Sequence, residues 1–126
     1  MKTLKTGITL LAVTATLLIL GSCKEKDPSI AKIFVRSNSN ELQADVRVVI
    51  IADVSKNESP VEYVDTLLTN NSGFVEFNLD DYYSAAGKKV AVANFDILCR
   101  KNNLTGTGKI RARVNTTAVE TIKITQ

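Results

Sequence analysis

The 126-residue sequence contains no histidine at all and only two cysteines. Histidine is the commonest general base and a frequent zinc ligand, so its absence excludes the usual catalytic triads and most zinc sites. Two cysteines are too few for a four-thiolate metal site. The sequence also lacks a pair of catalytic carboxylates, a glycine-rich phosphate loop and a nucleophile with a neighbouring base. We therefore expect a protein that is not an enzyme and that holds no metal or other cofactor.

The net charge is also small: 16 Lys and Arg against 13 Asp and Glu give +3. An excess this small does not indicate a nucleic-acid partner. The length predicts one domain, and 44% hydrophobic residues are enough for a core without disulfides.

Residues 1–22 have the layout of a secretory signal peptide. Lys2 and Lys5 give a positive start, and residues 7–20 form an uncharged, mostly apolar run. This run has 14 residues, whereas a membrane-spanning helix needs about 20. The segment is therefore expected to be removed, which leaves 14 basic and 13 acidic side chains in 104 residues.

The end of this segment, Leu20-Gly21-Ser22-Cys23, resembles the lipobox of bacterial lipoproteins. The resemblance implies that cleavage occurs before Cys23 and that this residue carries a thioether-linked diacylglycerol and usually an acylated amine. Two or three acyl chains make a stable anchor, at about 0.8 kcal/mol per buried methylene. The alternative is a plain signal peptide followed by an incidental cysteine.

Residues 23–29 form a short charged tether between the lipidated cysteine and the domain. Glu25 and Asp27 resemble the acidic export signal of surface lipoproteins in the Bacteroidota. The resemblance implies an outer-membrane location and favours the cell surface over the periplasmic face. The alternative is a solvated linker that holds the domain off the bilayer.

Residues 30–126 are predicted to form one antiparallel β-sandwich of about seven short strands, because apolar residues recur with period two and almost no helical period occurs. Strands are expected at residues 30–37, 42–54, 61–68, 74–79, 90–99, 109–115 and 120–125, the fifth of them central in its sheet. Residues 80–89 are predicted as a loop with one helical turn ended by Gly87, and residues 101–108 as a long turn.

The segment from Thr66 to Phe77 resembles the strand, polar turn, glycine and Phe-x-x-Phe hairpin of transthyretin-like domains, also called prealbumin-like or carboxypeptidase-regulatory-like domains. This resemblance implies a transthyretin-like β-sandwich, and such domains in lipoproteins are usually scaffolds or binding modules without chemistry. Independently of the resemblance, Gly73 fits a tight turn that needs a positive φ.

Two sets of side chains are candidates for a binding surface. Period two places Lys109, Arg111 and Arg113 along one face of one strand, where they could meet lipopolysaccharide phosphates, an acidic glycan or an acidic protein patch. Tyr82 and Tyr83 could form an exposed aromatic contact for a sugar or a protein. The alternatives are an edge strand kept charged against aggregation and a tyrosine that packs on the sheet.

Three further sites have a weaker indication of function. Asp65-Thr66-Leu67 resembles the acceptor of protein O-glycosylation in Bacteroidota, which would place a glycan on Thr66. Asn78, Asp80 and Asp81 offer oxygens to calcium, but their spacing matches no calcium loop, so a cap or a solvated turn is favoured. Cys99 ends an apolar run and is expected to be buried, as a free thiol or one joined to another molecule.

The sequence thus predicts an outer-membrane lipoprotein that acts as a non-catalytic accessory or structural subunit. The expected partners are membrane lipid, through acylated Cys23, and another envelope protein. The alternative function is a ligand-binding module for carbohydrate or lipopolysaccharide.

Overall fold

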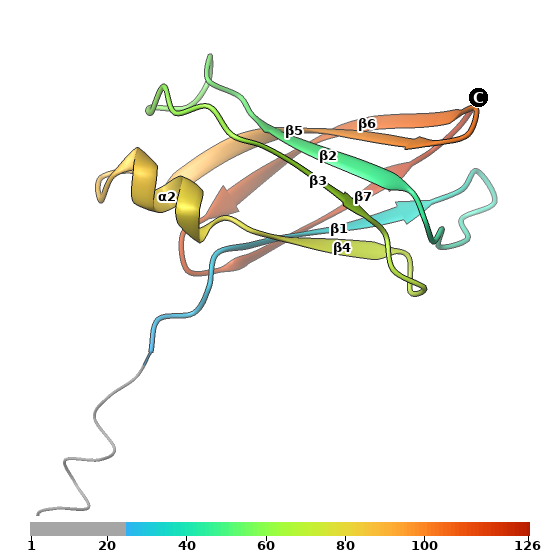
Figure 1. Ribbon diagram of the computed structural model, residues 1–126, viewed down its shortest axis with the longest axis horizontal. Helices are drawn as coiled ribbons and strands as arrows, with labels where there is room; N and C mark the ends of the chain where they lie inside the picture. Colours follow the sequence, from blue (N-terminus) through green and yellow to red (C-terminus); the bar gives the residue numbers. More distant parts are fainter. Residues whose placement is uncertain (1–24) are drawn as a thin grey trace, which may run out of the picture.

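The computed structural model describes residues 25–126, so the predicted signal peptide and the lipidation site at Cys23 lie outside the described residues. The described part is an all-β sandwich of seven strands and one short helix, which confirms the predicted fold class (Figure 1). The elements are β1 (Ile30–Arg36), β2 (Arg47–Ala52), β3 (Val64–Leu68), β4 (Phe74–Asn78), α2 (Asp80–Ala86), β5 (Val92–Lys101), β6 (Leu104–Arg113) and β7 (Thr117–Lys123).

The strands form two sheets that face each other. One sheet has three strands in the order β4-β1-β7, and the other has four strands in the order β3-β2-β5-β6. All pairs are antiparallel except β1 and β7, which run parallel with Ile30 opposite Thr117. This parallel pair departs from the wholly antiparallel sandwich that the sequence predicted.

The core lies between the sheets and is built by alternation along every strand except the edge strand β3, which has no buried residue. Strand β5 is an inner strand of its sheet, as the apolar run from Val90 to Cys99 predicted. The alternation expected on four other strands is confirmed for these buried inward residues: Val46, Val48, Ile50, Ala52, Val75, Phe77, Leu79, Ile110, Ala112, Ile122 and Ile124. The strand predicted from residue 42 begins only at Arg47, and Leu42, predicted on its inward face, is 42% exposed.

The long turn predicted at residues 101–108 is wrong. Only Asn102 and Asn103 form the turn, and β6 continues through Gly106 and Gly108. These glycines allow a close approach of β7, because a Cβ at Gly106 would overlap the backbone oxygen of Lys123 and one at Gly108 would overlap Cδ1 of Ile122. Glycine in this strand therefore marks a crossing of strands and not a turn.

The segment after β4 is more helical than predicted. Helix α2 spans seven residues instead of a single turn, and it ends at Gly87, whose φ of 98° suits a glycine. In the part of the chain that the structure describes, no helix has the length and apolarity needed to cross a bilayer.

The expected hairpin around Gly73 is instead a connection between the two sheets. Strand β3 belongs to the four-stranded sheet and β4 to the three-stranded one. Gly73 has the positive φ, 77°, that the sequence predicted, and a Cβ there would lie 2.7 Å from Cβ of Leu42. The buried Thr69 fixes this corner by accepting the Val46 N–H at 3.0 Å and donating to the Gln43 carbonyl at 2.7 Å.

The chain enters the sandwich at a fixed point, Ser29, which is fully buried. Its N–H donates to Oδ1 of Asp80 at 2.9 Å, and its Oγ accepts the N–H of Asn115 at 2.7 Å. The tether therefore leaves from one end of the sandwich, next to α2 and the β6–β7 turn (Figure 1).

Candidate docking surface on the four-stranded sheet

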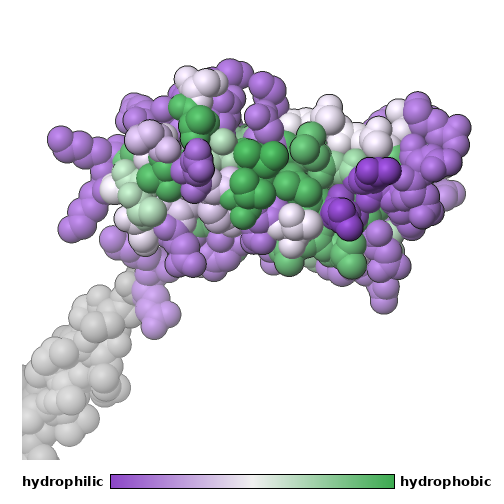
Figure 2. Space-filling model, turned by 45° about the horizontal axis from the view of Figure 1, so that its top comes forward, coloured by the Kyte–Doolittle hydropathy of each residue, from purple (hydrophilic) through white to green (hydrophobic). Residues whose placement is uncertain are grey.

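The outer face of the four-stranded sheet carries aliphatic side chains where a solvated sheet usually carries polar ones. The register places Val49 opposite Leu98 and Ile51 opposite Val64. Val64, Leu68 and Leu98 are 65%, 61% and 44% exposed, while Val49 and Ile51 are half-buried. We call these five residues the apolar stripe, and Figure 2 shows hydrophobic residues gathered at the centre of this side of the molecule.

The outer face of the three-stranded sheet has the exposed Val119 and two phenylalanines that are partly covered. Phe34 and Phe74 pack against each other with ring centroids 5.5 Å apart. The ammonium of Lys32 lies 4.2 Å from the Phe74 centroid and 3.7 Å from a carboxylate oxygen of Glu76. Since the stem of such a lysine shields apolar surface, this face is less available than the apolar stripe.

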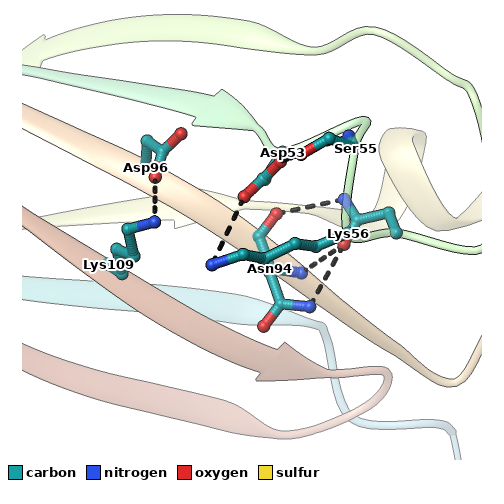
Figure 3. A network of polar contacts seen from close by, with 7 residues as sticks. Asp53, Ser55, Lys56, Asn94, Asp96 and Lys109 are labelled. Carbon is teal, nitrogen blue, oxygen red and sulfur yellow. Dashed lines mark hydrogen bonds and ion pairs between the residues drawn. The ribbon is translucent and has the colours of Figure 1, made fainter.

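A polar border runs along one side of the apolar stripe (Figure 3). The ammonium of Lys109 lies 3.6 Å from Oδ1 of Asp96, and that of Lys56 lies 3.9 Å from Oδ2 of Asp53. The hydroxyl of Ser55 donates to Asp53 at 2.6 Å, and this hydrogen bond, more than the nearby lysines, lowers the pKa of the Asp53 carboxyl. A shallow hollow of about 300 Å³ lies between this border and the stripe.

The loop that supplies this border is held in place by one half-buried amide, that of Asn57. Oδ1 of Asn57 accepts the backbone N–H of Asn94 at 2.7 Å, and its Nδ2 donates to the Asn94 carbonyl at 3.0 Å. The same Nδ2 lies 3.3 Å from the hydroxyl of Tyr82. These contacts tie the loop to β5, so the border is a fixed feature of the surface.

The basic ladder lies on this same outer face. Lys109, Arg111 and Arg113 are exposed on β6, and Ile110 and Ala112 between them are buried, as the alternation predicted. Lys109 is paired with Asp96, whereas Arg111 and Arg113 take part in no ion pair within residues 25–126. Strand β6 is an edge strand of its sheet, so an exposed charge there also discourages strand pairing with another chain.

The expectation of an exposed tyrosine contact is wrong. Tyr82 and Tyr83 are only 1% and 5% exposed, because α2 lies over the end of the sandwich and directs both rings inward. Tyr82 packs edge-on against Phe95 at 5.1 Å, and Tyr83 donates its hydroxyl to the Ala112 carbonyl at 2.7 Å. Burial raises the pKa of Tyr83 to about 12. The pair is a structural element of the core.

The remaining candidate residues lie apart from one another. Thr66 is exposed on β3 between Val64 and Leu68, and therefore within the docking face. Cys99 is a free, buried thiol, as predicted, and burial raises its pKa to about 12.

The oxygens considered for calcium are used in local hydrogen bonds. Oδ1 of Asn78 accepts the N–H of Asp80 at 2.9 Å, and Asp80 in turn holds Ser29. Asp81 follows in the exposed first turn of α2. No group of three metal-ligating side chains occurs among residues 25–126.

Sequence reasoning missed one pair of residues at the end of the apolar stripe. Arg47 on β2 and Arg100 on β5 lie directly opposite each other in the antiparallel register, both exposed on the outer face. The two residues are 53 positions apart in the sequence, and only the register of β2 and β5 brings them together. A hollow of about 610 Å³ lies here, lined also by Asp45, Leu68, Lys101 and Asn102.

Comparison with known proteins adds little to this geometry. No family model matches the chain, and no curated protein sequence matches it. Among solved structures, the chain is similar to chlorocatechol 1,2-dioxygenase from Pseudomonas putida, with 13% identity and a TM-score of 0.46. The similarity covers 83% of this chain and 63% of the dioxygenase, so the chain spans less than two thirds of that protein. A similarity at this level does not establish a shared activity.

Proposed function

We propose that this chain is a lipoprotein anchored in the outer membrane through acylated Cys23, and that it acts as a non-catalytic accessory or structural subunit of an envelope protein assembly. The outer face of the four-stranded sheet is the surface that docks on the partner. The observation that supports this proposal is the apolar stripe, whose most exposed residues, Val64 and Leu68, lie on the edge strand β3. Contiguous exposed aliphatic surface with a polar border is typical of protein interfaces.

The tether is compatible with this arrangement. Five residues lie between Cys23 and Ser29, so the six residue steps of an extended tether reach at most about 20 Å. The anchored end of the sandwich is then close to the bilayer, and the apolar stripe lies along the side of the domain. A partner in the same membrane can contact that side without leaving the bilayer.

The lipid anchor is tested by labelling cells with an alkyne-bearing fatty acid and purifying the protein. Wild-type protein is expected to carry the label, and Cys23→Ala is expected to lose it completely, because the thioether and the acylated amine both form on this residue. Cys99→Ala is the matched control and should keep the label, since its thiol is buried. Label retained by Cys23→Ala would contradict the anchor.

The docking surface is tested by co-purification from outer membranes solubilised in a mild detergent. Leu98→Ser removes a 44% exposed aliphatic side chain from the centre of the stripe and is expected to reduce the bound partner at least about tenfold. Val119→Ser makes the same change at a 57% exposed position on β7, in the other sheet, and should leave the amount unchanged. Equal losses in both variants, or migration of the wild type as a free monomer, would contradict the proposal.

The second candidate function is binding of carbohydrate or lipopolysaccharide by the basic ladder. The exposed guanidinium groups of Arg111 and Arg113 favour it, but the burial of the tyrosine pair removes the aromatic surface it would use. Ionic strength separates the two candidates, because charge-driven binding weakens steeply with salt and an apolar interface does not.

A further inference from the structure

The pair of Arg47 and Arg100 is an unusual feature of this surface. Like charges directly opposite each other on neighbouring strands destabilise a sheet. Neither guanidinium takes part in an ion pair or a side-chain hydrogen bond within the described residues 25–126. The fold therefore places two cations side by side without neutralising them.

The surroundings of the pair add positive charge and a hollow. Lys101 follows Arg100 and lines the same 610 Å³ hollow, where its ammonium donates to the Ala44 carbonyl at 2.8 Å. Asp45 is the one acid among the residues that line it. Leu68, which belongs to the apolar stripe, forms an apolar wall of this hollow.

The pair lies at the end of the sandwich opposite to the tether. Arg47 starts β2 and Arg100 lies near the end of β5, at the end of the sandwich opposite to Ser29. Strand β1 runs between these two ends over seven residues, or about 20 Å. The tether leaves from the Ser29 end, so the pair faces away from it.

We propose that Arg47 and Arg100, assisted by Lys101, form a binding site for an oxyanion. A guanidinium presents a planar fork of donors that matches a carboxylate or a phosphate, and two forks on adjacent strands can hold one such group between them. The ligand carries this group next to an apolar part, which lies on Leu68. The site goes beyond the docking proposal, because it can be measured with a small anion and no partner.

The test uses the full chain, purified from membranes in a nonionic detergent, and follows thermal unfolding by circular dichroism. Inorganic phosphate and succinate are added separately at about three times their Kd, against chloride at matched ionic strength. Either anion is expected to raise the Tm of the wild type by about 4 °C. A larger effect of succinate indicates a carboxylate of a protein partner as the natural group, and a larger effect of phosphate indicates a phosphorylated ligand.

Arg100→Gln is expected to abolish this rise in Tm. At low salt without added anion, its Tm should equal or exceed that of the wild type, because the repulsion between the two guanidinium groups is relieved. Arg47→Gln gives the same test from the other strand. Arg111→Gln, an exposed arginine on the same face, should keep the full rise. An equal rise in Arg100→Gln and the wild type, or no rise with either anion beyond that in chloride, would overturn the site, whereas loss of co-purification in Leu98→Ser is unaffected by either result.

Discussion

Phe95→Ala is expected to lower the free energy of unfolding by about 3–5 kcal/mol. The ring is completely buried on β5, the inner strand of the four-stranded sheet. It packs edge-on against Tyr82 at 5.1 Å and Tyr63 at 6.1 Å, so its removal leaves a cavity lined by rings that cannot collapse into it. The free energy of unfolding of a small domain is about 5–15 kcal/mol, so this loss is a large part of the total stability.

Urea denaturation of the full chain, followed by circular dichroism, measures this loss. Phe34→Ala is the matched control, because Phe34 is half-buried on the outer face of the other sheet. Phe34→Ala should lower the free energy of unfolding clearly less than Phe95→Ala, since water already reaches one side of the Phe34 ring. Equal losses for the two variants would show that the aromatic cluster around Phe95 is not a centre of the core.

Gly106→Ala is expected to lower the free energy of unfolding by about 2–3 kcal/mol, although it adds only one methyl group. That methyl would overlap the backbone oxygen of Lys123. A backbone atom can yield only if β7 moves away from β6, and the two strands are joined beside this point by two hydrogen bonds of 2.9 Å between Thr105 and Thr125. The substitution therefore opens one side of the sandwich.

The comparison that checks this reason is Gly108→Ala in the same urea experiment. The added methyl there meets Cδ1 of Ile122, the end of a flexible side chain that can rotate away. We expect a loss of about 1 kcal/mol at Gly108. A larger loss at Gly108 than at Gly106 would contradict the crossing of strands as the reason for these glycines.

Alternation made the sandwich predictable from the sequence. Residues such as Val48, Ile50 and Phe77 recur with period two, and a strand with one buried face leaves them only one orientation. The same rule placed Lys109, Arg111 and Arg113 correctly on an outer face. What this rule describes is local to a strand, and it failed at Leu42, which is exposed because β2 begins only at Arg47.

Features that depend on two distant segments were not predictable. Gly106 and Gly108 carry a turn signal unless the position of β7 is known. The inward direction of Tyr82 and Tyr83 depends on where α2 lies over the sheets. Arg47 and Arg100 become neighbours only through the β2–β5 register. The candidate site was therefore found in part, through its ladder, while its apolar stripe and arginine pair required the structure.

The parallel pairing of β1 with β7 sets the order in which the sandwich can assemble. Ile30 and Thr117 are opposite each other, although almost the whole domain lies between them in the chain. Closing so long a loop is entropically costly, and folds dominated by such contacts form slowly. Because a chain is synthesised from its N-terminus, β1 is made long before β7, the strand that pairs with it. One edge of β1 therefore stays unpaired until synthesis of the chain is nearly finished.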